Sequence, residues 1–158
     1  MLFGATSVVE NFGISMNLIK KGLKDVKVSG RSEIVPNSKG LTIMIDFAHS
    51  PKSLENILSS VKYYCKGRLI TVFGCGGNRD KGKREVMGEI AGKLSDFTII
   101  TSDNPRNEDP SEIIYEIEKG ILTTDGKYIC IVNRIEAIKY AIDIADENDI
   151  IILARKRS

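Results

Sequence analysis

Glycines and basic side chains follow one apolar run of the sequence, in an arrangement suited to binding an anion. Residues 69–73 (LITVF) are typical of a buried strand, and Gly74, Gly76 and Gly77 follow it at once. A loop that lacks side chains can approach a ligand closely. The glycines are followed by four basic residues opposed locally only by Asp80: Arg79, Lys81, Lys83 and Arg84. The pattern therefore predicts a strand, a glycine loop, a basic cluster that binds an anion, and then a helix.

A second polar loop follows the next apolar run. Residues 97–101 (FTIIT) predict a strand, and Ser102 to Arg106 (SDNPR) follow it. Arg106 offers a planar fork to a carboxylate, Asp103 can receive an ammonium group, and Asn104 offers both a donor and an acceptor. Pro105 stiffens the loop. These groups together complement an amino acid, although an Asx turn leading into the helix start at Pro110 explains the same residues.

The glycine loop nearly matches a nucleotide-binding P-loop. Four residues separate Gly77 from Gly82 and Lys83, as in a P-loop, but Arg84 stands where a Ser or Thr hydroxyl would hold Mg²⁺. An arginine does not ligate a cation. The dinucleotide-binding fingerprint also fails, because Arg79 occupies the place of its third glycine. A tight turn carrying solvated basic side chains remains the alternative explanation.

Three further side chains are candidates for chemistry. His49 is the only histidine, but no Ser or Cys nucleophile is evidently paired with it and one histidine does not make a metal site. Asp46, at the end of a predicted strand, is better placed to bind a ligand hydroxyl or a magnesium-bound water. Arg31 can contact a phosphate or remain a solvated surface residue.

The elements that position these residues alternate regularly between strand and helix. Expected strands cover residues 41–47, 69–73, 97–101, 128–132 and 149–154, and expected helices cover 52–64, 84–94, 111–120 and 134–145. Such alternation predicts an α/β fold, a Rossmann-like, doubly wound and mostly parallel sheet with helices on both faces. Both polar loops would then lie at the carboxyl ends of their strands, where such sheets bind ligands.

The first part of the chain does not follow this alternation. Residues 2–12 and a segment beginning at Ser15 predict two short helices, and the chain becomes extended from Gly30. We therefore expect a helical segment over residues 1–29 and an α/β domain over residues 30–158. The helical segment, lacking a packing partner, is expected to expose apolar surface and to favour self-association.

Composition excludes several classes of protein. The chain has 158 residues, 42% of them hydrophobic, which is enough for the core of one domain. A net charge of +2 without a basic stripe argues against nucleic acid as a partner. Three separated cysteines predict neither a disulfide framework nor a zinc site, and no apolar run could span a membrane. A cytoplasmic location is expected.

Four strings in fixed order resemble one family. They are GRSE at 30–33, DFAHSP at 46–51, FGCGGNRDKGKR at 73–84 and TSDNPRNEDP at 101–110. Together they resemble the C-terminal domain of the Mur ligases, in particular the diaminopimelate-adding branch, MurE. The resemblance runs from the last helices of that family's central ATP-binding domain, over residues 2–29, through its C-terminal domain, over residues 30–154.

The resemblance implies an ATP-dependent ligase of peptidoglycan synthesis. Its members add meso-diaminopimelate to a UDP-linked muramoyl dipeptide, with ATP and Mg²⁺ as cofactors. By the family's pattern, the residues that bind diaminopimelate are Arg79, Asp103, Asn104, Pro105 and Arg106. Arg31 and Asp46 match positions that contact the nucleotide. The resemblance places neither a catalytic side chain nor a metal ligand in this chain, which would act by positioning the amine.

The sequence also departs from the family's pattern. The family's P-loop is absent, so the chain is expected to be inactive alone and not to bind ATP tightly. The family continues after its last strand as AGKGHE, whereas this sequence reads ARKRS from Ala154. A one-base insertion would produce that change, and we hypothesise a frameshifted or split gene, which an intact reading frame on resequencing would refute. The alternatives are a stand-alone module that binds an amino acid or anion, and one chain of a split ligase; a nicotinamide-binding domain is a more distant alternative.

Overall fold

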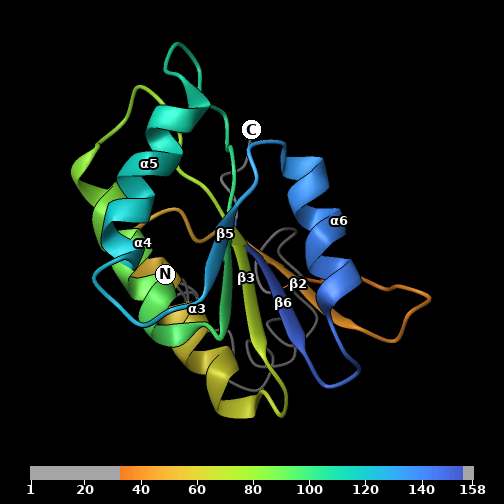
Figure 1. Ribbon diagram of the computed structural model, residues 1–158. Helices are drawn as coiled ribbons and strands as arrows, with labels where there is room; N and C mark the ends of the chain where they lie inside the picture. Colours follow the sequence, from red (N-terminus) through yellow and green to blue (C-terminus); the bar gives the residue numbers. More distant parts are fainter. Residues whose placement is uncertain (1–32, 155–158) are drawn as a thin grey trace, which may run out of the picture.

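The computed structural model describes residues 33–154, which form one sheet with helices on both faces (Figure 1). In this range the strands are β1 (Glu33–Ile34), β2 (Thr42–Asp46), β3 (Leu69–Phe73), β4 (Phe97–Ile100), β5 (Tyr128–Cys130) and β6 (Ile150–Ala154). The helices are α3 (Pro51–Tyr64), α4 (Gly82–Leu94), α5 (Pro110–Ile121) and α6 (Arg134–Ile144). Among these helices, none is long and apolar enough to cross a membrane.

The sheet is parallel except at one edge. Its strand order is β1-β2-β6-β3-β4-β5, and β1 pairs with β2 in the antiparallel direction. The register places Leu69 beside Ile150 and Phe73 beside Ile100. Because the other strands run in one direction, the loops that follow β2, β3 and β4 meet at a single edge of the sheet. This edge holds both polar loops that the sequence singled out.

Each face of the sheet supports its own hydrophobic core. Helices α3, α4 and α5 cover one face and α6 covers the other (Figure 1). β3 shows why a continuous apolar run is needed here, since Leu69 and Phe73 point into the first core while Ile70 and Val72 point into the second. All five residues of β3 are buried. The predicted doubly wound, mostly parallel α/β fold is confirmed.

Local capping fixes where the helices begin. Ser50 and Ser53 form a reciprocal capping box at the start of α3, with Pro51 at its first position. Asp109 caps α5, accepting a bond from the amide of Ser111 at 2.8 Å. Helix α4 begins at Gly82, two residues earlier than the sequence predicted. The Asp80 side chain accepts a bond from the Gly82 amide at 2.9 Å, which supports this earlier start.

Glycines allow α4 and α5 to pack with their backbones in close approach. A Cβ atom at Gly88 would lie 2.0 Å from the carbonyl oxygen of Ile117. At Gly120, a Cβ atom would lie 1.8 Å from the carbonyl oxygen of Glu85. Both separations are far shorter than a carbon–oxygen contact allows, so a side chain at either position requires the helices to separate. This close packing holds the start of α4 against α5, directly behind the polar loops.

The predicted helices within residues 1–29 lie outside the described residues, as do Arg31 and the tail after Ala154. Their predictions therefore remain predictions. Within the described range, residues 41–154 follow the predicted alternation of strands and helices closely.

We predict that Gly120→Ala lowers the free energy of unfolding by about 1 to 3 kcal/mol, because the added methyl group overpacks the contact with Glu85. Urea unfolding of the purified chain measures this change. Gly82→Ala is the matched control in α4, since its Cβ would meet only the flexible Asp80 carboxylate, at 3.3 Å. Equal losses in the two variants would contradict the packing explanation.

Candidate functional site

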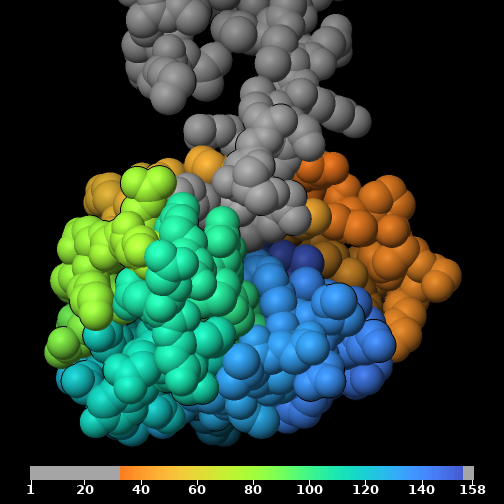
Figure 2. All heavy atoms as spheres, turned by 90° about the horizontal axis from the view of Figure 1, so that it is seen from above, coloured from red at the N-terminus to blue at the C-terminus, as the bar shows by residue number. Residues whose placement is uncertain are grey.

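A small cavity opens at the carboxyl edge of the sheet. Its volume is about 210 Å³, and the loops after β2, β3 and β4, together with the first turn of α4, supply its lining residues: His49, Gly74, Cys75, Gly76, Arg79, Lys83 and Asp103. Figure 2 views the molecule from this end, with the yellow-green atoms near residue 80 beside the green atoms of the segment after β4. The topology thus brings together side chains that are far apart in the sequence.

The cavity carries charges of both signs. Arg79 and Lys83 supply positive charge from the segment after β3, and Asp103 supplies negative charge from the loop after β4. Lys83 also donates a hydrogen bond from Nζ to the carbonyl oxygen of His49 at 2.8 Å, which ties α4 to the loop before α3. A cavity with this composition can receive a ligand that has both a carboxylate and an ammonium group.

Two of the loops around the cavity are joined through their backbones. The Gly77 amide donates to the carbonyl oxygen of Asn104 at 3.1 Å, and Arg106 donates from Nη1 to the carbonyl oxygen of Gly77. A Cβ atom at Gly77 would lie 1.8 Å from the carbonyl oxygen of Pro105. Glycine is therefore required at this position. The sequence analysis explained the lack of a side chain by the approach of a ligand, but at Gly77 it is the neighbouring loop that approaches the backbone closely.

Three residues without the freedom of glycine adopt left-handed backbone conformations here. They are Asn78, with φ of 51°, Asn104, with φ of 51°, and Arg106, with φ of 53°. Asparagine tolerates this region well, whereas an arginine in it costs on the order of 1 kcal/mol. The conformation of Arg106 must therefore be stabilised by its surroundings.

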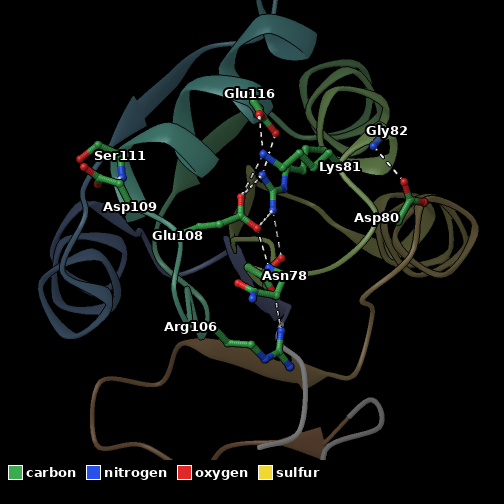
Figure 3. Close-up of polar contacts among 12 residues, drawn as sticks. Asn78, Asp80, Lys81, Gly82, Arg106, Glu108, Asp109, Ser111 and Glu116 are labelled. Atoms are coloured by element: carbon green, nitrogen blue, oxygen red, sulfur yellow. Dashed lines mark hydrogen bonds and ion pairs between the residues drawn. The ribbon is translucent and has the colours of Figure 1, made fainter.

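An ion-pair network built around one buried side chain adjoins the loops (Figure 3). Arg84, whose side chain has no exposed area, donates to both carboxylate oxygens of Glu108 at 2.9 and 3.0 Å. It also donates to Glu116 at 2.7 Å. Lys81 lies 3.4 Å from Glu108 and 4.0 Å from Glu116. Two cations of the predicted basic cluster are therefore neutralised by two glutamates, one from the loop before α5 and one from α5 itself.

Glu108 is the central acceptor of this network. It receives a hydrogen bond from the Asn78 amide as well as those from Arg84, as Figure 3 shows. The bonds from Arg84, and next the bond from Asn78, lower the pKa of the Glu108 carboxyl from 4.5 to about 2. Glu108 is therefore ionised throughout the neutral and mildly acidic range.

These contacts correct the prediction of a basic cluster opposed only by Asp80. Arg84 and Lys81 are partnered within the protein, because Glu108 and Glu116 approach from α5 and the loop before it. Arg79 and Lys83 are the members of that cluster that line the cavity. The positive charge available to a ligand is accordingly smaller than the sequence suggested.

The other predicted site residues lie at different distances from the cavity. Arg79 and Asp103 line it. Arg106 is adjacent, since Nη1 of Arg106 would lie 3.5 Å from a Cβ atom on the lining residue Gly76. Asn104 and Pro105 shape the loop through their carbonyl groups. Asp46 ends β2 and is half-buried.

Outside the glycine loop of residues 74–77, two lining residues were not assigned to the amino-acid site from the sequence. His49 lines the cavity, and its Nδ1 lies 3.0 Å from the carbonyl oxygen of Phe47. Lys83 lines it as well. Their position after strand ends was the available signal for both, because such loops converge in a parallel sheet.

The glycine loop after β3 does not provide the magnesium ligand of a P-loop. Within residues 33–154, no group of three His, Cys, Asp or Glu side chains could hold a metal ion. At the position where a P-loop hydroxyl would stand, Arg84 is buried and paired with two carboxylates. The glycine loop after β3 therefore cannot serve as a P-loop.

The fold and the strings of the site define a ligase domain. Residues 30–157 match the family described as Mur ligase, glutamate ligase domain. The chain belongs to the Mur ligase family, and the resemblance noted in the sequence is confirmed.

Two relatives that are at least 34% identical to the chain carry the same name. The chain is 48% identical over 152 residues to a UDP-N-acetylmuramoyl-L-alanyl-D-glutamate--2,6-diaminopimelate ligase of Caldanaerobacter subterraneus subsp. tengcongensis, covering 96% of this chain and 32% of the relative. A solved structure of a ligase with the same name has a TM-score of 0.73 and 34% identity, over 97% of this chain and 31% of that one. The chain thus spans about a third of the length of these relatives.

A more distant structure shares the fold alone. It is a bifunctional folylpolyglutamate synthase/dihydrofolate synthase from Yersinia pestis, complexed with AMPPNP and a Mn ion. Its TM-score is 0.70 and its identity 17%, over 90% of this chain and 32% of that one.

We predict that Glu108→Gln lowers the free energy of unfolding at neutral pH, because it leaves the buried Arg84 charge with one carboxylate fewer. The pKa of Glu108 is lowered on folding, so its contribution is fully present above pH 4.5 and is lost as the pH falls through about 2. Urea unfolding at several pH values measures the free energy of unfolding of the wild type and of the variant. The difference between wild type and variant should shrink across this interval, and a difference independent of pH would contradict the ion pair.

Proposed function

We propose that this chain is the substrate-binding C-terminal domain of an ATP-dependent ligase of peptidoglycan synthesis that adds meso-diaminopimelate to UDP-N-acetylmuramoyl-L-Ala-D-Glu. The observation that carries the proposal is that Arg79 and Asp103, of opposite charge, line one cavity, with the Arg106 guanidinium beside the lining residue Gly76. The names of the relatives support the choice of substrate.

The charges of the cavity favour an amino acid that carries a further carboxylate. Diaminopimelate has an amino and a carboxylate group at each end, whereas lysine lacks the second carboxylate. Asp103 can receive an ammonium group, and two arginines can receive carboxylates through paired donors. Arg106 already donates one nitrogen to Gly77, so its other nitrogens remain to bind the ligand. We assign Asn104 and Pro105 to the same substrate loop.

The remaining parts of the proposal concern the nucleotide. Asp46 and Arg31 are proposed to contact ATP, and the match to the family from residue 30 onward supports a domain boundary near Gly30. Residues 33–154 do not fit Mg²⁺ at the glycine loop, so this chain is proposed to bind and orient the amine in the cytoplasm without forming the amide bond alone.

Calorimetric titration of the 158-residue chain with meso-diaminopimelate tests the proposal. We expect binding that is selective over L-lysine. Arg79→Ala and Arg106→Ala should each weaken binding by about 2 kcal/mol or more, a factor of at least about thirty in Kd, because each removes a charged partner of a carboxylate.

Lys127→Ala is the matched control for these variants. Lys127 is also an exposed cation, but it lies beside β5 at the opposite edge of the sheet. This variant should bind as the wild type does. Equal affinity for L-lysine and meso-diaminopimelate, or the absence of binding at millimolar ligand, would contradict the proposed function of this chain.

A further inference from the structure

We infer that Glu108 is a positioning residue, which holds the loop of residues 103–106 in its binding conformation by anchoring it to the buried guanidinium of Arg84. The inference rests on the proposed function for the ligand that the loop receives. It concerns a residue that lies outside the cavity and outside the predicted substrate-binding set.

The contacts of Glu108 join three segments at one point. Its side chain accepts from Arg84 in α4 and from the Asn78 amide in the glycine loop. Its own amide donates to the carbonyl oxygen of Pro105 at 3.1 Å, which closes the turn that contains Arg106. Figure 3 shows Glu108 between Asn78 and Glu116, with Arg106 on the side of Asn78. Moving Glu108 would therefore move the turn that carries Arg106.

The buried charge of Arg84 explains why the loop is held firmly. A guanidinium with no exposed area requires carboxylate partners, since leaving it unpaired costs far more than a surface ion pair contributes. Glu108 provides two of its hydrogen bonds, and the turn from Pro105 must stay folded for those bonds to form. The cost of burying Arg84 thus opposes any relaxation of Arg106 out of its left-handed conformation.

Glu116 is a matched control within the same network. It accepts from the same Arg84 nitrogen, Nη1, at 2.7 Å, and it also lies near Lys81. Glu116 belongs to helix α5, so its bond to Arg84 does not tie down the loop of residues 103–106. Glu116→Gln therefore removes a carboxylate from Arg84 without removing the anchor of residues 103–106.

Amide exchange and NMR of the full chain test the inference without a ligand. Two backbone amides report on the loop: that of Gly77, which donates to the carbonyl oxygen of Asn104, and that of residue 108, which donates to the carbonyl oxygen of Pro105. In Glu108→Gln, both should exchange at least about tenfold faster than in the wild type. The Ile131 amide, bonded to Ile100 within the sheet, serves as the reference. The strong intraresidue amide-to-Hα signal expected of positive φ should weaken at Arg106. Glu116→Gln should leave the loop readouts unchanged.

A role in stability alone would give a different result. If Glu108→Gln and Glu116→Gln both lower the melting temperature and both keep wild-type exchange and φ in the loop, the inference is overturned. Should Glu108→Gln fail to fold, Glu108→Asp provides the same test. Its carboxylate is one methylene shorter and cannot reach both Arg84 and the Asn78 amide, so wild-type protection in that variant would also overturn the inference.

Titration with meso-diaminopimelate connects the inference to binding. We expect at least about tenfold weaker binding in Glu108→Gln and unchanged binding in Glu116→Gln. Equal affinity in the wild type and Glu108→Gln would overturn the positioning role even if the loop amides exchange faster. An absence of binding in all three proteins would contradict the proposed function, and the loop measurements would then decide the positioning role by themselves.

Discussion

The burial of one positive charge is the constraint on which this end of the molecule depends. Arg84 lies in the first turn of α4 with its side chain wholly covered, and the charge of its guanidinium is balanced by carboxylates from two other segments. A buried charge tolerates few arrangements of its partners, because any partner that leaves exposes the full cost of desolvation. Helix α4, helix α5 and the loop between β4 and α5 are consequently held in one arrangement around it.

The same network divides the basic residues after β3 by role. The four basic residues of the segment 79–84 fall into two pairs. Lys81 and Arg84 contact the glutamates, whereas Arg79 and Lys83 line the cavity. The protein thereby pairs two of the cations with its own glutamates and leaves two others beside the cavity for a ligand. Asp103 then balances part of that charge, which suits a zwitterion better than a simple anion.

Much of this architecture could be predicted from the sequence, because the signals are local. The apolar run at 69–73 and the capping pattern around Ser50 need no distant partner to be recognised. Arg84 could have been recognised only in part. It shares a helical face with Met87, Gly88 and Ala91, all of which are buried, and that spacing was the available signal.

The partners of Arg84 could not be predicted in the same way. Glu108 and Glu116 lie 24 and 32 residues further along the chain, and only the packing of α5 on α4 brings them near. The left-handed conformation of Arg106 is likewise a product of its surroundings, since nothing in an arginine favours it. The residues of the site were thus open to prediction from the sequence, whereas the contacts that hold them depend on the tertiary structure.

The glycine contact between α4 and α5 has a consequence for how this domain can vary. The distance between the two helix axes is set where Gly88 meets Ile117 and Gly120 meets Glu85, one residue beyond Arg84. That distance also decides whether Arg84 reaches Glu116 and Glu108. Core volume and loop geometry are therefore coupled through a single spacing, because a larger residue in the helix interface widens the gap that the ion pairs of Arg84 must bridge.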